Sequence, residues 1–311
     1  MTPVLGGVAF PSWHGHLDVW ALLSMVVLAY VAAVRRERAR RPAADGSVVT
    51  GGQVGVFAAG IAVLLVASDW PVHDLAEHYL YSVHMVQHLL LTLVAAPLLL
   101  LGTPAWMARR LLGRCRRLRI VRALARPVPG LIQFNLVLVL SHWPLVVEAT
   151  VRHHPLHFVA HAALLGSALL MWMPVASPSP DVPRARPLTQ MLYLFLQTVV
   201  PTVPASFLTF GARPLYHVYE HMPRLWGISA LTDQQVAGLI MKIGAGFYLW
   251  TIIAVIFFRW YASEERQDRD ARRQSPAPAA PSDEDEVLLW DDVERELRRL
   301  DAGPSSKETA P

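Results

Sequence analysis

Residues 78–104 read HYLYSVHMVQHLLLTLVAAPLLLLGTP, and this stretch decides the fold. From Tyr79 to Leu101 it contains no acidic or basic side chain other than histidine. Roughly 20 apolar residues are enough for a helix to cross a hydrocarbon core about 30 Å thick, so the stretch predicts a membrane-spanning helix. His84 and His88 are four residues apart and therefore lie on one face of that helix. Because an ionisable group at membrane depth is costly, this pair is a candidate functional site.

The composition of the whole chain also indicates a membrane protein. Of its 311 residues, 53% are hydrophobic and 17% are charged, and the apolar residues occur in long blocks. These features are typical of a polytopic, all-α helical bundle rather than a soluble domain. The single cysteine, Cys115, excludes a disulfide framework and a multi-cysteine metal site.

Seven apolar segments predict about seven transmembrane helices. They cover residues 17–34, 52–68, 78–101, 129–148, 155–174, 188–210 and 236–260. Eight arginines are interleaved with apolar residues between the third and fourth segments, and we expect this connection to form an amphipathic helix along the membrane surface. Pro144, Pro201 and Pro204 lie within predicted spans and predict kinks or breaks there.

The placement of arginine predicts the orientation. Arginine clusters follow the first, third, fifth and seventh spans, whereas the opposite connections contain only Arg152, Arg213 and Arg224. Because positive charge accumulates in cytoplasmic loops, we expect the N-terminus outside and the C-terminus in the cytoplasm. We expect a membrane domain over residues 1–262 and a charged, mostly disordered cytoplasmic tail over residues 263–311, with a short amphipathic helix near 284–300 as an alternative there.

All thirteen histidines fall on the predicted outer side of the membrane. Two pairs with a spacing of four, His84/His88 and His157/His161, lie at similar depth on helices that both begin at the outer face. Four imidazoles can therefore surround one metal ion. Imidazole suits copper, zinc and iron, and a thioether adds a preference for reduced copper. Further candidate ligands are His78, His142 and Met85.

Acidic residues gather around the same predicted outer mouth: Asp69, Asp74, Glu77 and Glu148. Such carboxylates can attract a cation or orient the N–H groups of ligating histidines. A structural role is the alternative, because histidines in membrane helices often hydrogen-bond across helices and histidines in loops are often solvated. The residues alone leave both interpretations open.

Several motifs occur in order between residues 70 and 260. They are His84-Met85-Val86-Gln87-His88-Leu89-Leu90-Leu91, Ala96-Pro97, Leu101-Gly102-Thr103-Pro104, Trp172-Met173-Pro174-Val175, Leu215-Tyr216 with Tyr219, and Asp233-Gln234-Gln235 with Ala237-Gly238 and Met241. This pattern resembles the CtaG family of polytopic bacterial cytochrome c oxidase assembly factors. Lys242 departs from it, because that family usually has an aromatic residue after the methionine of the last span.

The resemblance implies a non-enzymatic assembly factor, or chaperone, in the bacterial inner (cell) membrane. It implies copper supply to the oxidase, with cytochrome c oxidase subunits and the lipid bilayer as partners and no nucleic acid. On matching positions, His84, His88, His157 and His161 are expected to bind the copper. Self-association is left open.

Two other functions fit parts of the pattern. A membrane electron carrier with a single haem needs histidines on two helices, which this chain has. A copper transporter would need ligands that continue toward the cytoplasm, and the inner half offers only Met171, Met173 and Met191. A membrane metalloprotease is rejected, because His84 to His88 reads HMVQH and lacks the glutamate of His-Glu-x-x-His.

Overall fold

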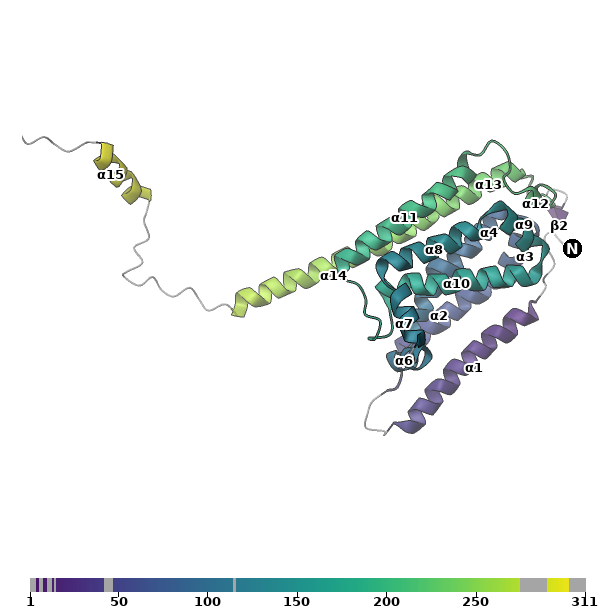
Figure 1. Cartoon of the computed structure of the whole chain (residues 1–311), viewed down its shortest axis with the longest axis horizontal. Helices are drawn as coiled ribbons and strands as arrows, with labels where there is room; N and C mark the ends of the chain where they lie inside the picture. Colours follow the sequence, from purple (N-terminus) through teal and green to yellow (C-terminus); the bar gives the residue numbers. More distant parts are fainter. Residues whose placement is uncertain are drawn as a thin grey trace, which may run out of the picture. The chain divides into compact units, whose positions relative to one another are not determined.

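The computed structural model describes residues 4–5, 8–9, 13, 15–41, 47–113, 116–274 and 290–301. Within these residues the chain is almost entirely helical, and the only strands are the short antiparallel pair β1 (Val4–Leu5) and β2 (Val8–Ala9) (Figure 1). The chain divides into two units, residues 1–260 and 261–311. The predicted all-α class is therefore confirmed.

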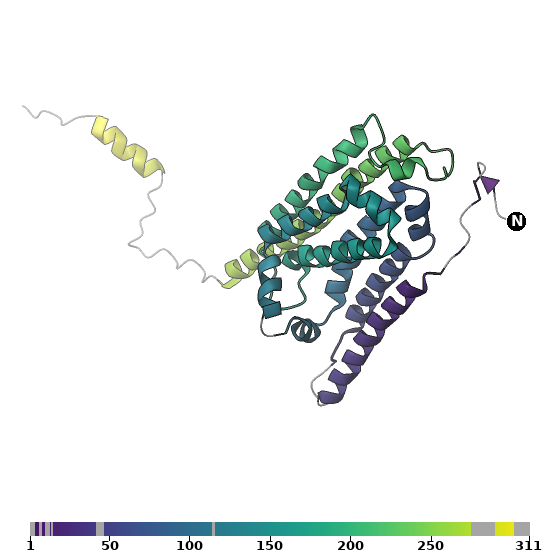
Figure 2. The ribbon, with the colours of Figure 1, turned by 45° about the vertical axis from the view of Figure 1, so that its right-hand side comes forward.

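The helices follow one another with short connections. Their bounds are α1 Leu17–Arg40, α2 Gly51–Ser68, α3 Val72–His78, α4 Tyr81–Leu89, the π-helical η2 Leu90–Ala95, α5 Ala96–Gly102, α6 Ala105–Leu112, α7 Arg116–Leu124, α8 Pro127–Ser141, α9 Pro144–Arg152, α10 His154–Ala176, α11 Pro187–Phe210, α12 His217–Glu220, α13 Ala230–Leu239, the π-helical η3 Ile240–Gly244, α14 Ala245–Gln274 and α15 Trp290–Asp301. Figure 2 shows the long helices of the first unit side by side.

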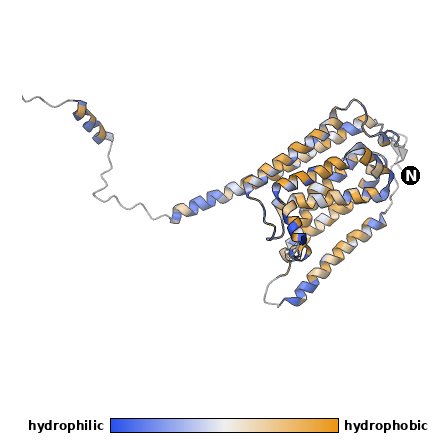
Figure 3. Cartoon of the chain, viewed as in Figure 1, coloured by the Kyte–Doolittle hydropathy of each residue, from blue (hydrophilic) through white to orange (hydrophobic). Residues whose placement is uncertain are grey.

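Among the described residues, six helical segments are long and apolar enough to cross a membrane. They are Leu17–Arg40, Gly51–His78, Tyr81–Gly102, His154–Ala176, Pro187–Phe210 and Ala230–Ala271. A seventh results if α7 and α8, which meet at 84°, form one bent span. Hydrophobic residues cover most of these helices in Figure 3. The chain is thus a multi-pass membrane protein, and its predicted orientation stays a prediction.

The fourth predicted span, residues 129–148, is not one continuous helix. Helix α8 ends at Ser141 and α9 begins at Pro144. Pro144 has no N–H for a continuing helix, and it restricts Trp143 to extended backbone, with φ −66° and ψ 132°. In contrast, α11 runs through Pro201 and Pro204 as one continuous helix, so no break forms at these two prolines.

A break also precedes the histidine-bearing helix. Helix α3 ends at His78, Leu80 is extended, and α4 begins only at Tyr81. The carboxylate of the buried Asp233, on α13, accepts hydrogen bonds from the backbone N–H groups of Tyr81 at 2.7 Å and Ser82 at 3.0 Å. A carboxylate at a helix N-terminus satisfies free N–H groups and complements the helix dipole. Helix α13 therefore fixes where α4 starts.

After α4 the helix continues directly as the π-helical segment η2. The Thr92 hydroxyl donates to the His88 carbonyl at 2.6 Å, and the Trp172 indole of α10 donates to the Thr92 carbonyl at 2.8 Å. These bonds satisfy backbone groups in the irregular turn and tie it to α10. Trp172 is only 2% exposed, so the link lies inside the bundle.

Helices α11 and α13 approach closely at Gly238. A β-carbon there would lie 2.8 Å from the Ala205 carbonyl oxygen, so only glycine fits without moving the helices. The next turn is the π-helical η3, where the Lys242 ammonium lies 5.7 Å from the centre of the Phe210 ring. The glycine and aspartate of the Asp-Gln-Gln-x-Ala-Gly motif thus position α13 against both α11 and α4.

The basic connection forms two short helices, α6 and α7, and its Arg114 and Cys115 lie outside the described residues. Leu118 and Val121 of α7 pack against the bundle core, whereas Arg122 donates to the Asp181 carbonyl at 2.9 Å. The expected amphipathic helix is therefore present, and its place on a membrane surface stays a prediction. In the second unit, α15 covers residues 290–300 of the predicted 284–300 segment and ends one residue beyond it, and the first six residues of that segment are not described.

Candidate metal centre

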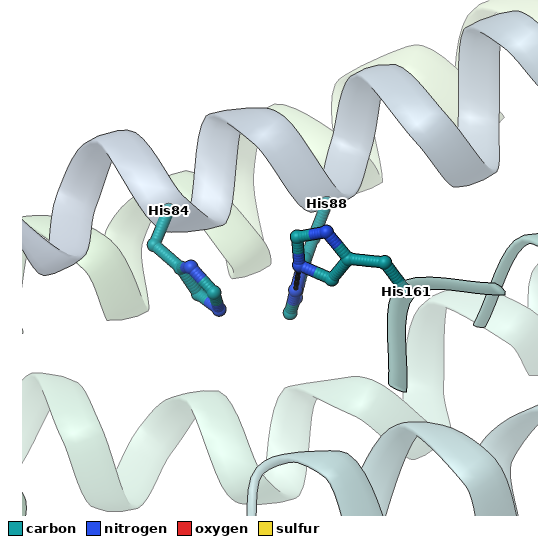
Figure 4. Close-up of side chains that lie close together, drawn as sticks. All are labelled: His84, His88 and His161. Carbon is teal, nitrogen blue, oxygen red and sulfur yellow. Dashed lines mark hydrogen bonds between the residues drawn. The ribbon is translucent and has the colours of Figure 1, made fainter. Parts of the chain in front are cut away.

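Three imidazoles from two helices converge inside the bundle. His84 and His88 of α4 and His161 of α10 each offer a ring nitrogen, and these three nitrogens lie within 4.8 Å of one another (Figure 4). His88 Nε2 and His161 Nε2 are 3.2 Å apart. His84 and His88 are 8% and 6% exposed, and His161 is half-buried. We call these three residues the histidine trio.

The spacing within the trio suits a metal ion. Ring nitrogens bound at about 2.0–2.1 Å in tetrahedral geometry lie about 3.3 Å from one another, close to the separation between His88 Nε2 and His161 Nε2. The Nδ1 atoms of His84 and His88 are buried without a hydrogen-bond partner in the described chain, and in His88 this is not the nitrogen that faces His161. The three-histidine group can therefore hold a metal ion through His88 Nε2.

His157, the fourth predicted ligand, lies beside the trio and faces two ways. Its Nε2 is 3.1 Å from His161 Nε2, and its Nδ1 is 3.6 Å from a carboxylate oxygen of Glu77 on α3. The second distance is too long for a hydrogen bond, and this Nδ1 is buried without a partner. His157 therefore connects the trio with Glu77.

The three remaining predicted ligands are placed differently. His142 is buried, its ring centre lies 5.1 Å from that of His88, and its Nε2 has no partner in the described chain. Met85 is fully buried and packs with Tyr81 and Met241, and it lines a cavity of about 50 Å³ together with His88 and His142. His78 lies on α3, exposed and outside the trio, with its Nδ1 3.3 Å from the Asp74 carbonyl.

The acidic residues near the site are bonded mainly to histidine and tryptophan. Glu77 lies 3.1 Å from His73 Nε2 and 3.4 Å from His154 Nδ1, and Asp74 lies 2.8 Å from His16 Nε2. Asp69 accepts from the Trp20 indole at 2.7 Å, whereas Glu148 lies 3.9 Å from Arg152. Glu77 and Asp74 thus contact histidines, but His16, His73 and His154 are not among the predicted ligands.

Two residues that hold the site together were missed in the sequence. The Gln87 amide donates to the Ala67 carbonyl at 2.8 Å and to His73 Nδ1 at 3.2 Å. It therefore fixes His73 as the tautomer that carries its proton on Nε2, toward Glu77. Asp233 caps the helix of the trio from 152 residues away. Gln87 could have been recognised as a candidate because it is a polar residue inside an apolar run. The role of Asp233 could not, because the residues that it caps lie far away in the sequence.

Three buried tyrosines, Tyr81, Tyr216 and Tyr219, pack together next to His84. Tyr81 stacks on His84 with ring centres 5.9 Å apart and also contacts the rings of Tyr216 and Tyr219. Burial raises the pKa of Tyr216 to about 12, and it raises the pKa of Tyr219 further. Both phenols thus stay protonated, and they donate to the carbonyls of His142 at 2.9 Å and Ala76 at 3.2 Å.

Comparison with known families gives a match over the membrane helices. The family model for the cytochrome c oxidase caa3 assembly factor (Caa3_CtaG) matches residues 28–263, which include the trio, the Asp233 cap and every described helix from α2 to α13. No curated protein and no solved structure matches the chain. The match covers well over half of the 311 residues. The chain therefore belongs to the family of cytochrome c oxidase caa3 assembly factors.

Proposed function

We propose that this multi-pass protein of the bacterial inner membrane binds a copper ion at His84, His88 and His161 and supplies it to a metal centre of cytochrome c oxidase during assembly. Copper is the cargo, and the oxidase subunit that receives it is the partner. The role is that of a chaperone and involves no catalysis. Family membership supports the assembly role, and the trio supports the copper.

One observation carries the copper proposal: three imidazole nitrogens lie within 4.8 Å of one another at the centre of an apolar bundle. Imidazole is a good ligand for copper. Met85 and His142 line a cavity together with His88 of the trio, and they are further soft or borderline donors. The only cysteine of the chain lies in the basic connection, so the trio binds without thiolate. Neutral nitrogen ligands hold copper less tightly than thiolates do, which suits a protein that must release its cargo.

The geometry favours copper over the two other functions. A haem with two axial histidines needs its iron and the flat porphyrin between the two ligating nitrogens, whereas His88 Nε2 and His161 Nε2 are in hydrogen-bond contact at 3.2 Å. A transporter needs ligands on both sides of the bilayer midplane. The described ring contacts among histidines all belong to the α3 end of the bundle, where α4 and α10 begin.

The test is the metal content of the detergent-purified protein after loading with Cu(I) under reducing conditions. We expect about one copper per chain in the wild type and a loss of most of it in His84→Ala/His88→Ala. The matched control is His217→Ala/His221→Ala, which removes an exposed pair with the same spacing of four. This control is expected to retain the wild-type copper content.

An absorption spectrum of the same samples separates the alternatives. A Soret band that disappears in His84→Ala/His88→Ala would assign the trio to haem and overturn the copper proposal. Equal copper in the wild type and in this variant would remove the trio as the binding site. Strong acidification is expected to release the copper, because protonated imidazole is not a ligand.

A further inference from the structure

A chain of imidazoles leads from the loop before α1 to the trio. The ring centres of His16 and His73 are 4.7 Å apart, those of His73 and His157 5.6 Å, and those of His157 and His161 4.2 Å. A cavity of about 160 Å³ follows the same route between α1, α2 and α10. It is lined by these four histidines and by His154. We call this cavity the port.

In the described part of the chain, two buried carboxylates beside the port pair with histidines and with no arginine or lysine. Asp74 and Glu77 are 6% and 9% exposed, and the histidines that pair with them line the port. Carboxylates that pair with no arginine or lysine can attract a cation.

Glu77 is held beside three histidines that line the port. His73 Nε2 binds one carboxylate oxygen at 3.1 Å, and Gln87 fixes the tautomer of His73 that makes this bond. The other oxygen lies 3.4 Å from His154 Nδ1 and 3.6 Å from His157 Nδ1. His73 is thus a positioning residue, and Glu77, His154 and His157 remain to contact a cation.

His157 connects this group to the trio through its two ring nitrogens. Its Nδ1 faces Glu77 at 3.6 Å and its Nε2 faces His161 at 3.1 Å. The His154 side chain is 62% exposed, whereas that of His157 is 5% exposed, so the route runs from solvent into the bundle. Each step is short enough for an ion to keep one ligand while it gains the next.

We propose that the port is a loading route for the metal ion, in which Glu77 and His154 capture a copper cation and His157 passes it to the trio. The proposal rests on the proposed function, because it assumes that the trio holds copper. It adds a division of roles: Glu77 and His154 set the rate of loading, and the trio, supported by His157, sets the amount held at equilibrium. Electrostatic capture of this kind commonly changes association rates by about ten- to a thousandfold.

The experiment follows Cu(I) transfer from a coloured Cu(I) chelate to the detergent-purified full-length protein by stopped-flow absorbance. We expect Glu77→Gln to slow loading at least about tenfold and to weaken its dependence on ionic strength, with the final copper content unchanged. The matched control is Glu148→Gln, whose carboxylate pairs with Arg152 at 3.9 Å. It should load at the wild-type rate.

A second variant guards against loss of the fold in Glu77→Gln. His154→Gln changes a mostly exposed side chain and should also slow loading while the trio still fills. Wild-type loading rates in both variants would overturn the port. A lower final copper content in Glu77→Gln, with wild-type loading in His154→Gln, would overturn it too and make Glu77 a support of the trio. Failure of the copper function itself is distinguishable, because the wild type would then take no copper from the chelate.

Discussion

Helices α4 and α10 carry the same pattern of two histidines four residues apart, yet the structure uses the two pairs differently. In α4 both rings join the trio, whereas α10 contributes His161 and turns His157 toward Glu77. The spacing fixes only that both rings share one helix face. The neighbouring helix decides what each ring meets: His88 of α4 meets His161 of α10, and the start of α10 also meets α3 through Glu77.

The largest expected effect separates the two histidines of α10. His161→Ala should weaken equilibrium copper binding more than about a hundredfold, because it removes a direct ligand of the trio. His157→Ala should weaken it by about ten- to a hundredfold, the usual cost of losing a supporting group. Competition with a Cu(I)-specific chelator at equilibrium measures both constants. Equal losses in the two variants would place His157 in the trio and make the two pairs equivalent.

A smaller effect should follow from freeing the start of α4. Asp233→Ala removes the carboxylate that caps Tyr81 and Ser82, and we expect a destabilisation of about 0.5–2 kcal/mol together with weaker copper binding. Thermal unfolding in detergent and chelator competition give the two quantities. The matched variant is Ser229→Ala, which removes the side-chain cap of α13 at Thr232. It should lower stability alone, and a loss of copper there would contradict a specific link between Asp233 and the trio.

The smallest expected effect is that of His78→Ala. His78 stands six residues before His84, and the break at Tyr79 and Leu80 leaves it exposed on α3. Copper content, binding constant and unfolding temperature should therefore match the wild type. A loss of copper comparable to that of the α4 pair would restore His78 as a ligand and show that α3 reorganises around the ion.

Much of the architecture was predictable because apolar length is a direct signal. The predicted spans 155–174 and 188–210 differ from α10 and α11 by at most two residues at either end. The two histidine pairs were predictable for the same reason, since a spacing of four reports a shared face. Breaks at positions such as Trp143 were harder to place, because Pro144 predicts an interruption and Pro201 predicts one equally well where none forms.

The parts of the site that sequence could not supply depend on contacts between distant residues. His78 looked like part of the third span because nothing in Tyr79-Leu80 signals a break, and the cap that sets the start of α4 comes from Asp233. Gln87 gave no indication of its partners, because its bonds reach Ala67 and His73 on other helices. Such partners follow from how the helices pack and not from the pattern within one helix.

The two π-helical turns determine what the loss of one residue would do to the helices that contain them. Segment η2 follows the trio helix directly, and η3 packs against α4, with Gly244 facing Leu89. A π turn absorbs one residue more than an α turn at the same place, so the helix halves on either side keep their faces. Loss of one codon within residues 90–95 would return the segment to an ordinary α-helix without rotating His88 away from α10. A helical wheel drawn through the segment therefore misplaces the residues beyond it by about 100°.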